Sequence, residues 1–193
     1  LCAGRVPDVG IAGDVGVVLR QFIDGIRKQN RNGWAQQLKA GREAMRQFME
    51  SSFDPEKTPI HPLKLFSEVS QFIDKDTVVC IDGGDMCVWG NIMLPAMGPG
   101  QFITQASSIF GCLGTGIPYA VAAKLANPDK KVILTTGDGS FGLTLMEFDT
   151  AIRHNIPFVA VIGNDACWGM IHRPFKMQKG QTFGCELSKR RYD

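Results

Sequence analysis

The stretch from Lys131 to Gly169, KVILTTGDGSFGLTLMEFDTAIRHNIPFVAVIGNDACWG, carries the strongest fold signal in the chain. Two apolar runs, at 132–136 and 158–162, enclose a glycine-rich turn and an amphipathic segment that ends before Pro157. This order of strand, turn, helix and strand is typical of a parallel βαβ unit. Polar residues therefore gather at the carboxyl ends of two strands.

The helix of this unit has a sequence signal for its start. Thr144 and Glu147 have the spacing of a capping box, and Leu143 and Phe148 then occupy the staple positions on either side of the cap. We therefore expect the helix to begin at Thr144.

The glycine-rich turn lies where open α/β sheets bind anionic ligands, at strand ends beside a helix start. Gly137, Gly139 and Gly142 satisfy the dinucleotide pattern G-x-G-x-x-G. Asp138 argues against that function, because its carboxylate would repel the pyrophosphate unless a cation lay between them. Asp138 and Asp165, at neighbouring strand ends, offer the hard oxygen ligands that Mg²⁺ prefers. The residues thus indicate a metal-bridged diphosphate site.

The same stretch resembles a known family. Gly137-Asp138-Gly139-Ser140, followed by the pair Asn164-Asp165, resembles the motif of thiamine pyrophosphate (TPP) enzymes, particularly of acetolactate synthase-like enzymes and benzaldehyde lyase-type carboligases. The other matching positions are Glu147-Phe148-Asp149-Thr150, Arg153, Pro157 and Trp168-Gly169. The resemblance implies a doubly wound parallel α/β sheet, the pyrophosphate-binding domain of such an enzyme.

The resemblance also implies the metal ligands and the cofactor contacts. Asp138 and Asp165 would bind Mg²⁺ through their side chains, and Cys167 through its backbone carbonyl. The family usually has Asn at the position of Asp165, so Asn164 is the alternative ligand, although the spacing favours Asp165. The remaining cofactor contacts implied in this stretch are Gly137, Gly139, Ser140, Trp168 and Gly169.

Two upstream loops complete the implied site. Gly84-Asp85-Met86, after the predicted strand 77–81, falls where the diphosphate loop of acetolactate synthases usually reads Gly-Gln-His; an unrelated turn is the alternative. After the predicted strand 101–107, Gly111 would give a carbonyl to the cofactor's 4′-amino group, and Leu113 would wedge the cofactor into its bent shape. These two are the implied catalytic residues, with Leu113 as an ordinary core residue the alternative.

The chain is expected to contain parts of two domains. Residues 1–33, with a short strand at 9–11, resemble the end of the family's middle domain, and 34–58 are a connecting helix and linker. Residues 59–193 are the pyrophosphate-binding domain, which stops before the last strand and helix that the family would place there. We therefore expect residues after Phe175 to be poorly anchored.

The composition excludes several function classes. With 44% hydrophobic and 21% charged residues, the chain is typical of soluble globular proteins. Its net charge of +2 indicates neither nucleic-acid nor membrane binding, and no apolar run is long enough for a membrane span. Six cysteines without a C-x-x-C pair are typical of reduced thiols, and we expect a cytoplasmic protein.

The resemblance implies an enzyme that makes or breaks C–C bonds beside the carbonyl of 2-oxo acids or aldehydes. A 2-hydroxyacyl-CoA lyase or an oxalyl-CoA decarboxylase-like enzyme is the alternative, and a dinucleotide-binding module is a distant one. The family uses a glutamate from the pyrimidine-binding domain of a partner subunit. We therefore expect a homodimer or homotetramer, and an inactive fragment if this chain is isolated.

Overall fold

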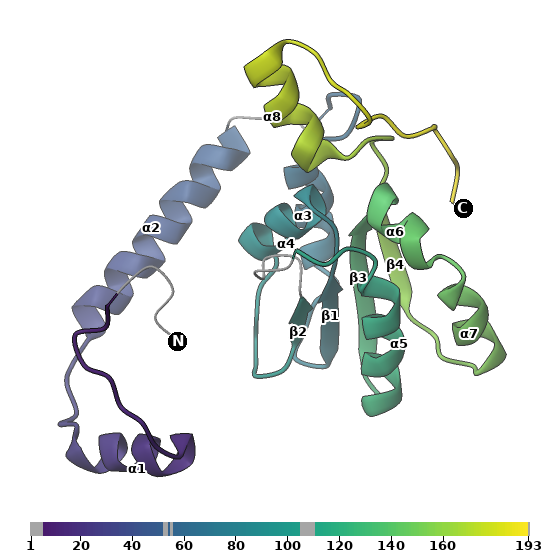
Figure 1. The fold of residues 1–193 in the computed structure, drawn as a ribbon. Coiled ribbons are helices and arrows are strands. Elements are labelled where there is room, and N and C mark those ends of the chain that lie inside the picture. Colours follow the sequence, from purple (N-terminus) through teal and green to yellow (C-terminus); the bar gives the residue numbers. More distant parts are fainter. Residues whose placement is uncertain (1–5, 52–53, 55, 105–110, 193) are drawn as a thin grey trace. The chain divides into compact units, whose positions relative to one another are not determined.

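The computed structural model describes residues 6–51, 54, 56–104 and 111–192. The chain divides into two compact units, residues 1–48 and residues 49–193. The first unit is helical: α1 covers Val15–Gly25, and α2, Asn32–Ser51, continues past the boundary (Figure 1). The strand predicted at 9–11 is wrong, because those residues lie in irregular backbone and pair with none of the described strands.

The second unit is built on a four-stranded parallel sheet with the spatial order β2-β1-β3-β4 (Figure 1). β1 and β3 are buried along almost their whole length, as expected for a sheet covered on both faces. The predicted strands are confirmed, except that positions 105–107 lie outside the described residues. The strands are β1 Thr77–Ile81, β2 Phe102–Thr104, β3 Lys131–Gly137 and β4 Val159–Gly163.

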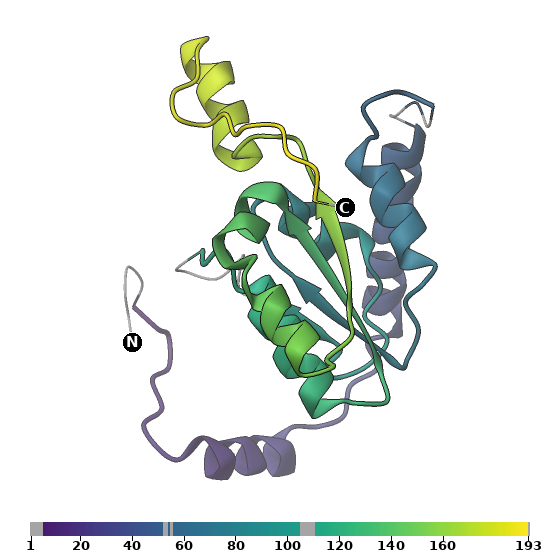
Figure 2. The ribbon, with the colours of Figure 1, turned by 90° about the vertical axis from the view of Figure 1, so that its right-hand side faces the viewer.

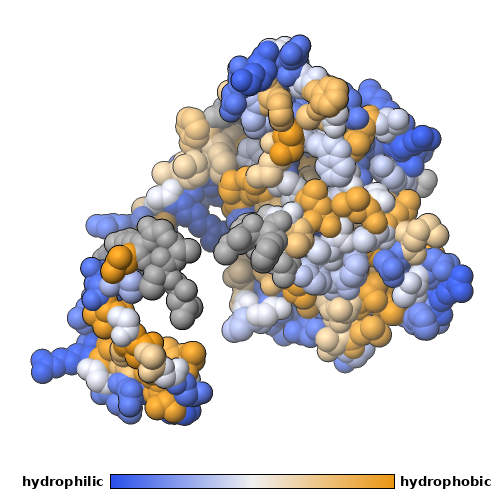
Figure 3. Space-filling view, viewed as in Figure 1, coloured by the Kyte–Doolittle hydropathy of each residue, from blue (hydrophilic) through white to orange (hydrophobic). Residues whose placement is uncertain are grey.

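Helices cover both faces of this sheet, which confirms the predicted α/β fold class. One core packs α3 and α4 against β1 and β3, and the other packs α5, α6 and α7 against the opposite face (Figure 2). Apolar side chains also remain at the surface of both units (Figure 3). The helices of this unit are α3 Pro62–Ser70, α4 Asp85–Met93, α5 Gly116–Ala126, α6 Asp138–Thr144, α7 Glu147–Arg153 and α8 Gly169–Lys179.

The helix after β3 begins earlier than predicted. α6 starts at Asp138, directly after the strand, and Thr144 is its last residue rather than the cap of a new helix. The Thr144 hydroxyl donates to the carbonyl of Gly114 at 2.8 Å, and Glu147 begins a separate helix, α7. Leu143, a predicted staple residue, is exposed. The capping-box prediction is therefore wrong, because a long-range hydrogen bond engages the hydroxyl.

Successive strands are added to opposite edges of the sheet before and after the return from β2 to β3. β2 is added on one side of β1, and the chain then returns so that β3 pairs with the other side. The connections that leave these two strands cover opposite faces, α4 after β1 and α6 after β3. In open α/β sheets the ligand crevice lies outside the carboxyl ends of the strands at such a point.

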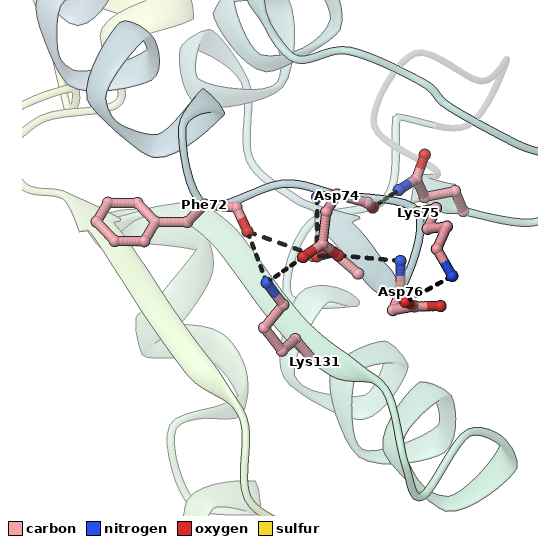
Figure 4. Close-up of polar contacts among 7 residues, drawn as sticks. Phe72, Asp74, Lys75, Asp76 and Lys131 are labelled. Atoms are coloured by element: carbon pink, nitrogen blue, oxygen red, sulfur yellow. Dashed lines mark hydrogen bonds and ion pairs between the residues drawn. The ribbon is translucent and has the colours of Figure 1, made fainter.

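A polar network around Asp74 lies at the amino ends of β1 and β3 (Figure 4). Lys131 Nζ lies 2.6 Å from Asp74 Oδ2 and donates to the carbonyl of Phe72 at 3.3 Å. The Thr77 hydroxyl and the Asp76 N–H donate to Asp74 Oδ1 at 2.8 and 2.9 Å. The hydrogen bonds from Lys131 and then Thr77 lower the pKa of Asp74 to about 2.

The segment after α8 returns along the loop that follows β4. Trp168 N donates to the carbonyl of Cys185, and Leu187 N donates to that of Ala166, both at 2.7 Å. Cys185 is buried. The expectation of poor anchoring after Phe175 is therefore wrong from Cys185 on, because backbone hydrogen bonds tie that part to the loop, whereas residues 176–181 are exposed. Among the described residues, no helix has the length and apolar character that a membrane span needs.

Candidate functional site

Asp138 and Asp165 lie at the carboxyl ends of two paired strands. Gly137 of β3 is the Cα partner of Gly163 of β4, and each aspartate follows its strand within two residues. Asp138 is only 3% exposed, whereas Asp165 is open to solvent. Burial, and then the Asp165 charge, raise the pKa of Asp138, although nearby backbone N–H groups oppose the shift. A buried carboxylate beside a second one favours a cation.

The neighbours Asn164 and Asp165 have different surroundings. Asn164 Nδ2 donates to the carbonyl of Arg190 at 2.7 Å. Asp165 Oδ1 accepts from Cys167 N at 3.3 Å, and its charge acts on Asp138. The Asn164 side chain is thus engaged by the returning segment, while the Asp165 carboxylate interacts with the buried carboxylate.

Cys167 has a thiol that stays protonated near neutral pH. Burial, then a hydrogen bond with Asp165, then the charges of Asp165 and Asp138 raise the pKa of this thiol to about 12. Because hard cations such as Mg²⁺ take oxygen ligands, the backbone carbonyl is the donor that Cys167 can offer. Within the described ranges, no three acidic, histidine or cysteine side chains are grouped to hold a metal. Two carboxylates suit Mg²⁺, which usually takes other ligands from phosphate and water.

Trp168 ties the loop after β4 to the loop after β3. Its ring lies over Gly139, where an added Cβ would come within 2.9 Å of three ring atoms. Any side chain at Gly139 would therefore displace the ring. This close approach connects the segment that carries Asp165 to the segment that carries Asp138.

Asp85, which directly follows the loop after β1, lies near Asp165. It begins α4 and forms an ion pair with Arg173 of α8. A Cβ on Gly169 would lie within 3.0 Å of the side chains of Asp85, Asp165 and Arg173, so these three side chains surround one point. Burial raises the pKa of Asp85; Arg173 opposes this shift and the Asp165 charge adds to it.

The end of β1 is organised by Asp82, a buried carboxylate. Asp82 accepts hydrogen bonds from Gly83 N at 2.6 Å and from Gly116 N at 2.9 Å, which joins β1 to the start of α5. Gly84 is the N-cap of α4 and has no side chain to bond its first N–H groups. Met86 packs its side chain in the core, so only its backbone can face a ligand.

The loop that contains Leu113 is fixed through its neighbour Gly114. Gly114 N donates to the hydroxyl of Ser140 at 2.9 Å, and the carbonyl of Gly114 accepts from the hydroxyl of Thr144 at 2.8 Å. Leu113 is 39% exposed and belongs to neither core, contrary to the alternative that it is a core residue. Gly111 has a φ of +55°, which favours glycine.

Sequence reasoning missed two residues of this site. Asp82 directly follows an apolar strand and precedes two glycines, and this position was a usable signal for a residue that organises the loop. Arg173 lies 88 positions from Asp85 in the sequence, and no local pattern connects the two.

Comparison with known proteins gives these residues a family. Residues 82–191 match the family described as thiamine pyrophosphate enzyme, C-terminal TPP binding domain. The match covers more than half of the chain and includes every predicted site residue. The predicted family resemblance is therefore confirmed.

Individual relatives agree with this match. A probable acetolactate synthase of Mycobacterium bovis is 35% identical over 185 residues, which is 95% of this chain and 33% of the relative. Human 2-hydroxyacyl-CoA lyase 2 is 32% identical over 184 residues, 94% of this chain and 29% of the relative. The solved structure of a thiamine diphosphate-dependent 4-hydroxybenzoylformate decarboxylase from Rhodococcus jostii RHA1 aligns with a TM-score of 0.61 and 28% identity, over 68% of this chain and 25% of that chain.

The chain spans about a third of the length of the curated relatives it matches. The family match over the whole candidate site, together with these relatives, identifies the chain as a member of the thiamine pyrophosphate enzymes that carries their C-terminal TPP-binding domain.

Proposed function

We propose that a Mg²⁺ ion joins Asp138 and Asp165 to the diphosphate of TPP. The protein would be an acetolactate synthase-like enzyme that makes or breaks C–C bonds beside the carbonyl of 2-oxo acids or aldehydes. The buried Asp138 carboxylate beside Asp165, at the ends of paired strands, is the observation that carries this proposal. Without a cation, both carboxylates would repel a diphosphate; with Mg²⁺ between them, the contact becomes favourable.

The remaining ligands are proposed to come from backbone groups. The carbonyl of Cys167 would bind the metal, since Mg²⁺ takes oxygen rather than sulfur ligands. The first N–H groups of α4, which have no side-chain cap from Gly84, suit phosphate oxygens. Asn164 is the weaker candidate ligand, because its amide is engaged by the carbonyl of Arg190.

When bound, TPP supplies the carbanion chemistry and electron sink that amino-acid side chains lack. The chain's own part is to orient the cofactor. Leu113 would press against it, held by the hydrogen bonds that fix Gly114, and the Gly111 carbonyl would accept from its amino group. Holding reacting groups together in this way can make proton removal effectively intramolecular.

A second reaction class is favoured by the relatives. Human 2-hydroxyacyl-CoA lyase 2 aligns over 94% of the chain, nearly as much as the acetolactate synthase does. The sequence Gly84-Asp85-Met86 also departs from the usual Gly-Gln-His of acetolactate synthases. Lyase or decarboxylase chemistry on 2-hydroxyacyl-CoA or oxalyl-CoA substrates is therefore the second candidate. The family match gives no support to a dinucleotide-binding module.

The activating glutamate is proposed to come from the pyrimidine-binding domain of a partner subunit, in a cytoplasmic homodimer or homotetramer. Two observations support this proposal. The chain covers only about a third of its relatives' length, which leaves room for such a domain elsewhere in the protein. Both units also expose apolar side chains that a neighbouring domain or subunit could cover (Figure 3).

Calorimetric titration of the full-length protein with TPP tests the metal bridge. We expect binding with Mg²⁺ and none with a chelator, because Asp138 and Asp165 accept the diphosphate only through a cation. Asp138→Ala should abolish binding, whereas Asp149→Ala, which removes an exposed carboxylate of α7, should not change it. Equal TPP affinity with and without chelator would contradict the bridge. Offering pyruvate or a 2-hydroxyacyl-CoA to the loaded protein separates the two reaction classes.

A further inference from the structure

Asp85 poses an electrostatic problem for the proposed diphosphate site. Its carboxylate begins α4, where the N–H groups proposed to bind phosphate oxygens lie, and it shares the surroundings of Gly169 with Asp165. Because Asp138 and Asp165 suffice as side-chain ligands for Mg²⁺, a third carboxylate adds only repulsion toward the diphosphate. A nearby positive group is needed to offset that repulsion.

We propose that Arg173 is a positioning residue of the cofactor site, which neutralises Asp85 and so allows the diphosphate to approach the start of α4. This inference rests on the proposed function. The guanidinium of Arg173 donates to Asp85 Oδ2, and the side chains of the pair are 51% and 28% exposed, respectively. Arg173 thus acts on the cofactor through Asp85 rather than by direct contact.

The position of Arg173 in the fold supports this role. α8 directly follows the loop that carries Asp165, and β1 and β4 are separated in the sheet by β3. The ion pair therefore joins the loop after β1 to the helix after β4, across the strand end that carries Asp138. A second contact brings the two helices together: an added Cβ on Gly84 would lie 2.8 Å from Cβ of Met170.

A purely structural surface ion pair makes a different prediction. Exposed pairs contribute little to stability, and their removal leaves distant ligand binding unchanged. Arg153 offers a matched comparison, because it pairs with Asp149 at 2.6 Å on α7 and its side chain is 73% exposed. Arg173→Met and Arg153→Met remove the same charge from two ion pairs, of which only the first lies at the proposed site.

The test is calorimetric titration of the full-length protein with TPP at saturating Mg²⁺, with thermal melting to show that each variant is folded. We expect Arg173→Met to weaken TPP binding by about tenfold, because the Asp85 carboxylate is then left uncompensated beside the diphosphate. Arg173→Lys, which keeps the charge, should stay within about threefold of the unmodified protein. Arg153→Met should leave the affinity unchanged.

The double variant Asp85→Asn, Arg173→Met gives the sharpest result. If Arg173 acts through Asp85, removing both charges should recover most of the affinity lost in Arg173→Met, and Asp85→Asn alone closes the thermodynamic cycle. If the double variant bound TPP as weakly as Arg173→Met does, the proposal would be overturned, because Arg173 would then act on the cofactor directly. Unchanged affinity in Arg173→Met would overturn it as well. If the unmodified protein fails to bind TPP with Mg²⁺, the proposed function itself fails.

Discussion

The carboxylates at the two ends of the central strands, β1 and β3, have opposite electrostatic surroundings. At the amino ends, Asp74 has Lys131 and Thr77 as partners, and its pKa is lowered to about 2 (Figure 4). At the carboxyl ends, Asp138 is buried beside Asp165, and its pKa is raised. The first end contains its own compensating cation, whereas at the second end the described groups that act on Asp138 are another carboxylate and backbone N–H donors. A buried carboxylate with a raised pKa beside a second carboxylate indicates a ligand site rather than a structural contact.

The two shifts have opposite consequences for stability. Because the pKa of folded Asp74 lies below its ordinary value of 3.8, its contribution is present above pH 3.8 and is lost as the pH falls toward 2. Because the pKa of folded Asp138 is raised, its contribution is present in acid and is lost as the pH rises through the folded value. Above its folded pKa, ionised Asp138 therefore destabilises the metal-free protein.

The largest effect is expected from Asp138→Asn, which removes the buried charge at the carboxyl ends of the strands and so tests the contrast with Asp74. TPP affinity at saturating Mg²⁺ should fall by at least about a hundredfold, because a direct metal ligand is lost. The midpoint of thermal unfolding in chelator should stay the same or rise by a few degrees, because a repelled buried charge is removed. Calorimetry and melting measured on one preparation check both expectations.

Asp74→Asn is the control for this experiment, and it should give the reverse pattern, with unchanged TPP affinity and a lower unfolding midpoint. If Asp138→Asn lowered the midpoint in chelator as Asp74→Asn does, Asp138 would be a structural carboxylate and the contrast between the two ends would be lost.

An intermediate effect is expected from Leu113→Ala. This variant tests whether an apolar side chain near the carboxyl ends of the strands contacts the cofactor. Deuterium exchange at C2 of bound TPP should slow by about tenfold, while TPP affinity changes by less than about threefold, because wedging serves reactivity more than binding. Leu113 is 39% exposed, so little packing is lost. NMR exchange and calorimetry on the full-length protein measure the two quantities.

Leu125→Ala is the matched control for Leu113→Ala, since Leu125 is an exposed leucine on the last turn of α5. It should change neither quantity. If Leu113→Ala lowered the rate of C2 deuterium exchange and the TPP affinity by the same factor, Leu113 would serve cofactor binding rather than hold the cofactor in its bent shape.

The smallest effect concerns the acid stability of Asp74→Asn. The variant should be slightly less stable than the unmodified protein at pH 7, and this difference should shrink as the pH falls from 3.8 toward 2, where Asp74 becomes protonated. Thermal melting across this range measures the difference. Asp149→Asn, in an exposed pair of α7, serves as the control. A difference that stays constant from pH 7 to pH 2 would contradict the role given to the Lys131 network.

Much of the fold was predictable because the signals are local. The apolar runs at 77–81, 132–136 and 158–162 end in glycines and aspartates, and the structure forms β1, β3 and β4 within one residue of these ranges. The helix start predicted at Thr144 was wrong, because Thr144 ends α6 and its hydroxyl bonds to the carbonyl of Gly114, thirty residues away. The spacing of a capping box cannot reveal a competing partner so distant in the sequence.

From the order of its residues alone, the chain specified a parallel α/β sheet, a pair of aspartates at two strand ends and a resemblance to TPP enzymes. These follow from side-chain periodicity and from residues that lie close together in the sequence. The order β2-β1-β3-β4, the separate surroundings of Asn164 and Asp165, and the pairing of Asp85 with Arg173 emerged only in three dimensions. They depend on which distant segments the sheet brings together, and the burial and charge that shift a pKa arise only after those segments have met.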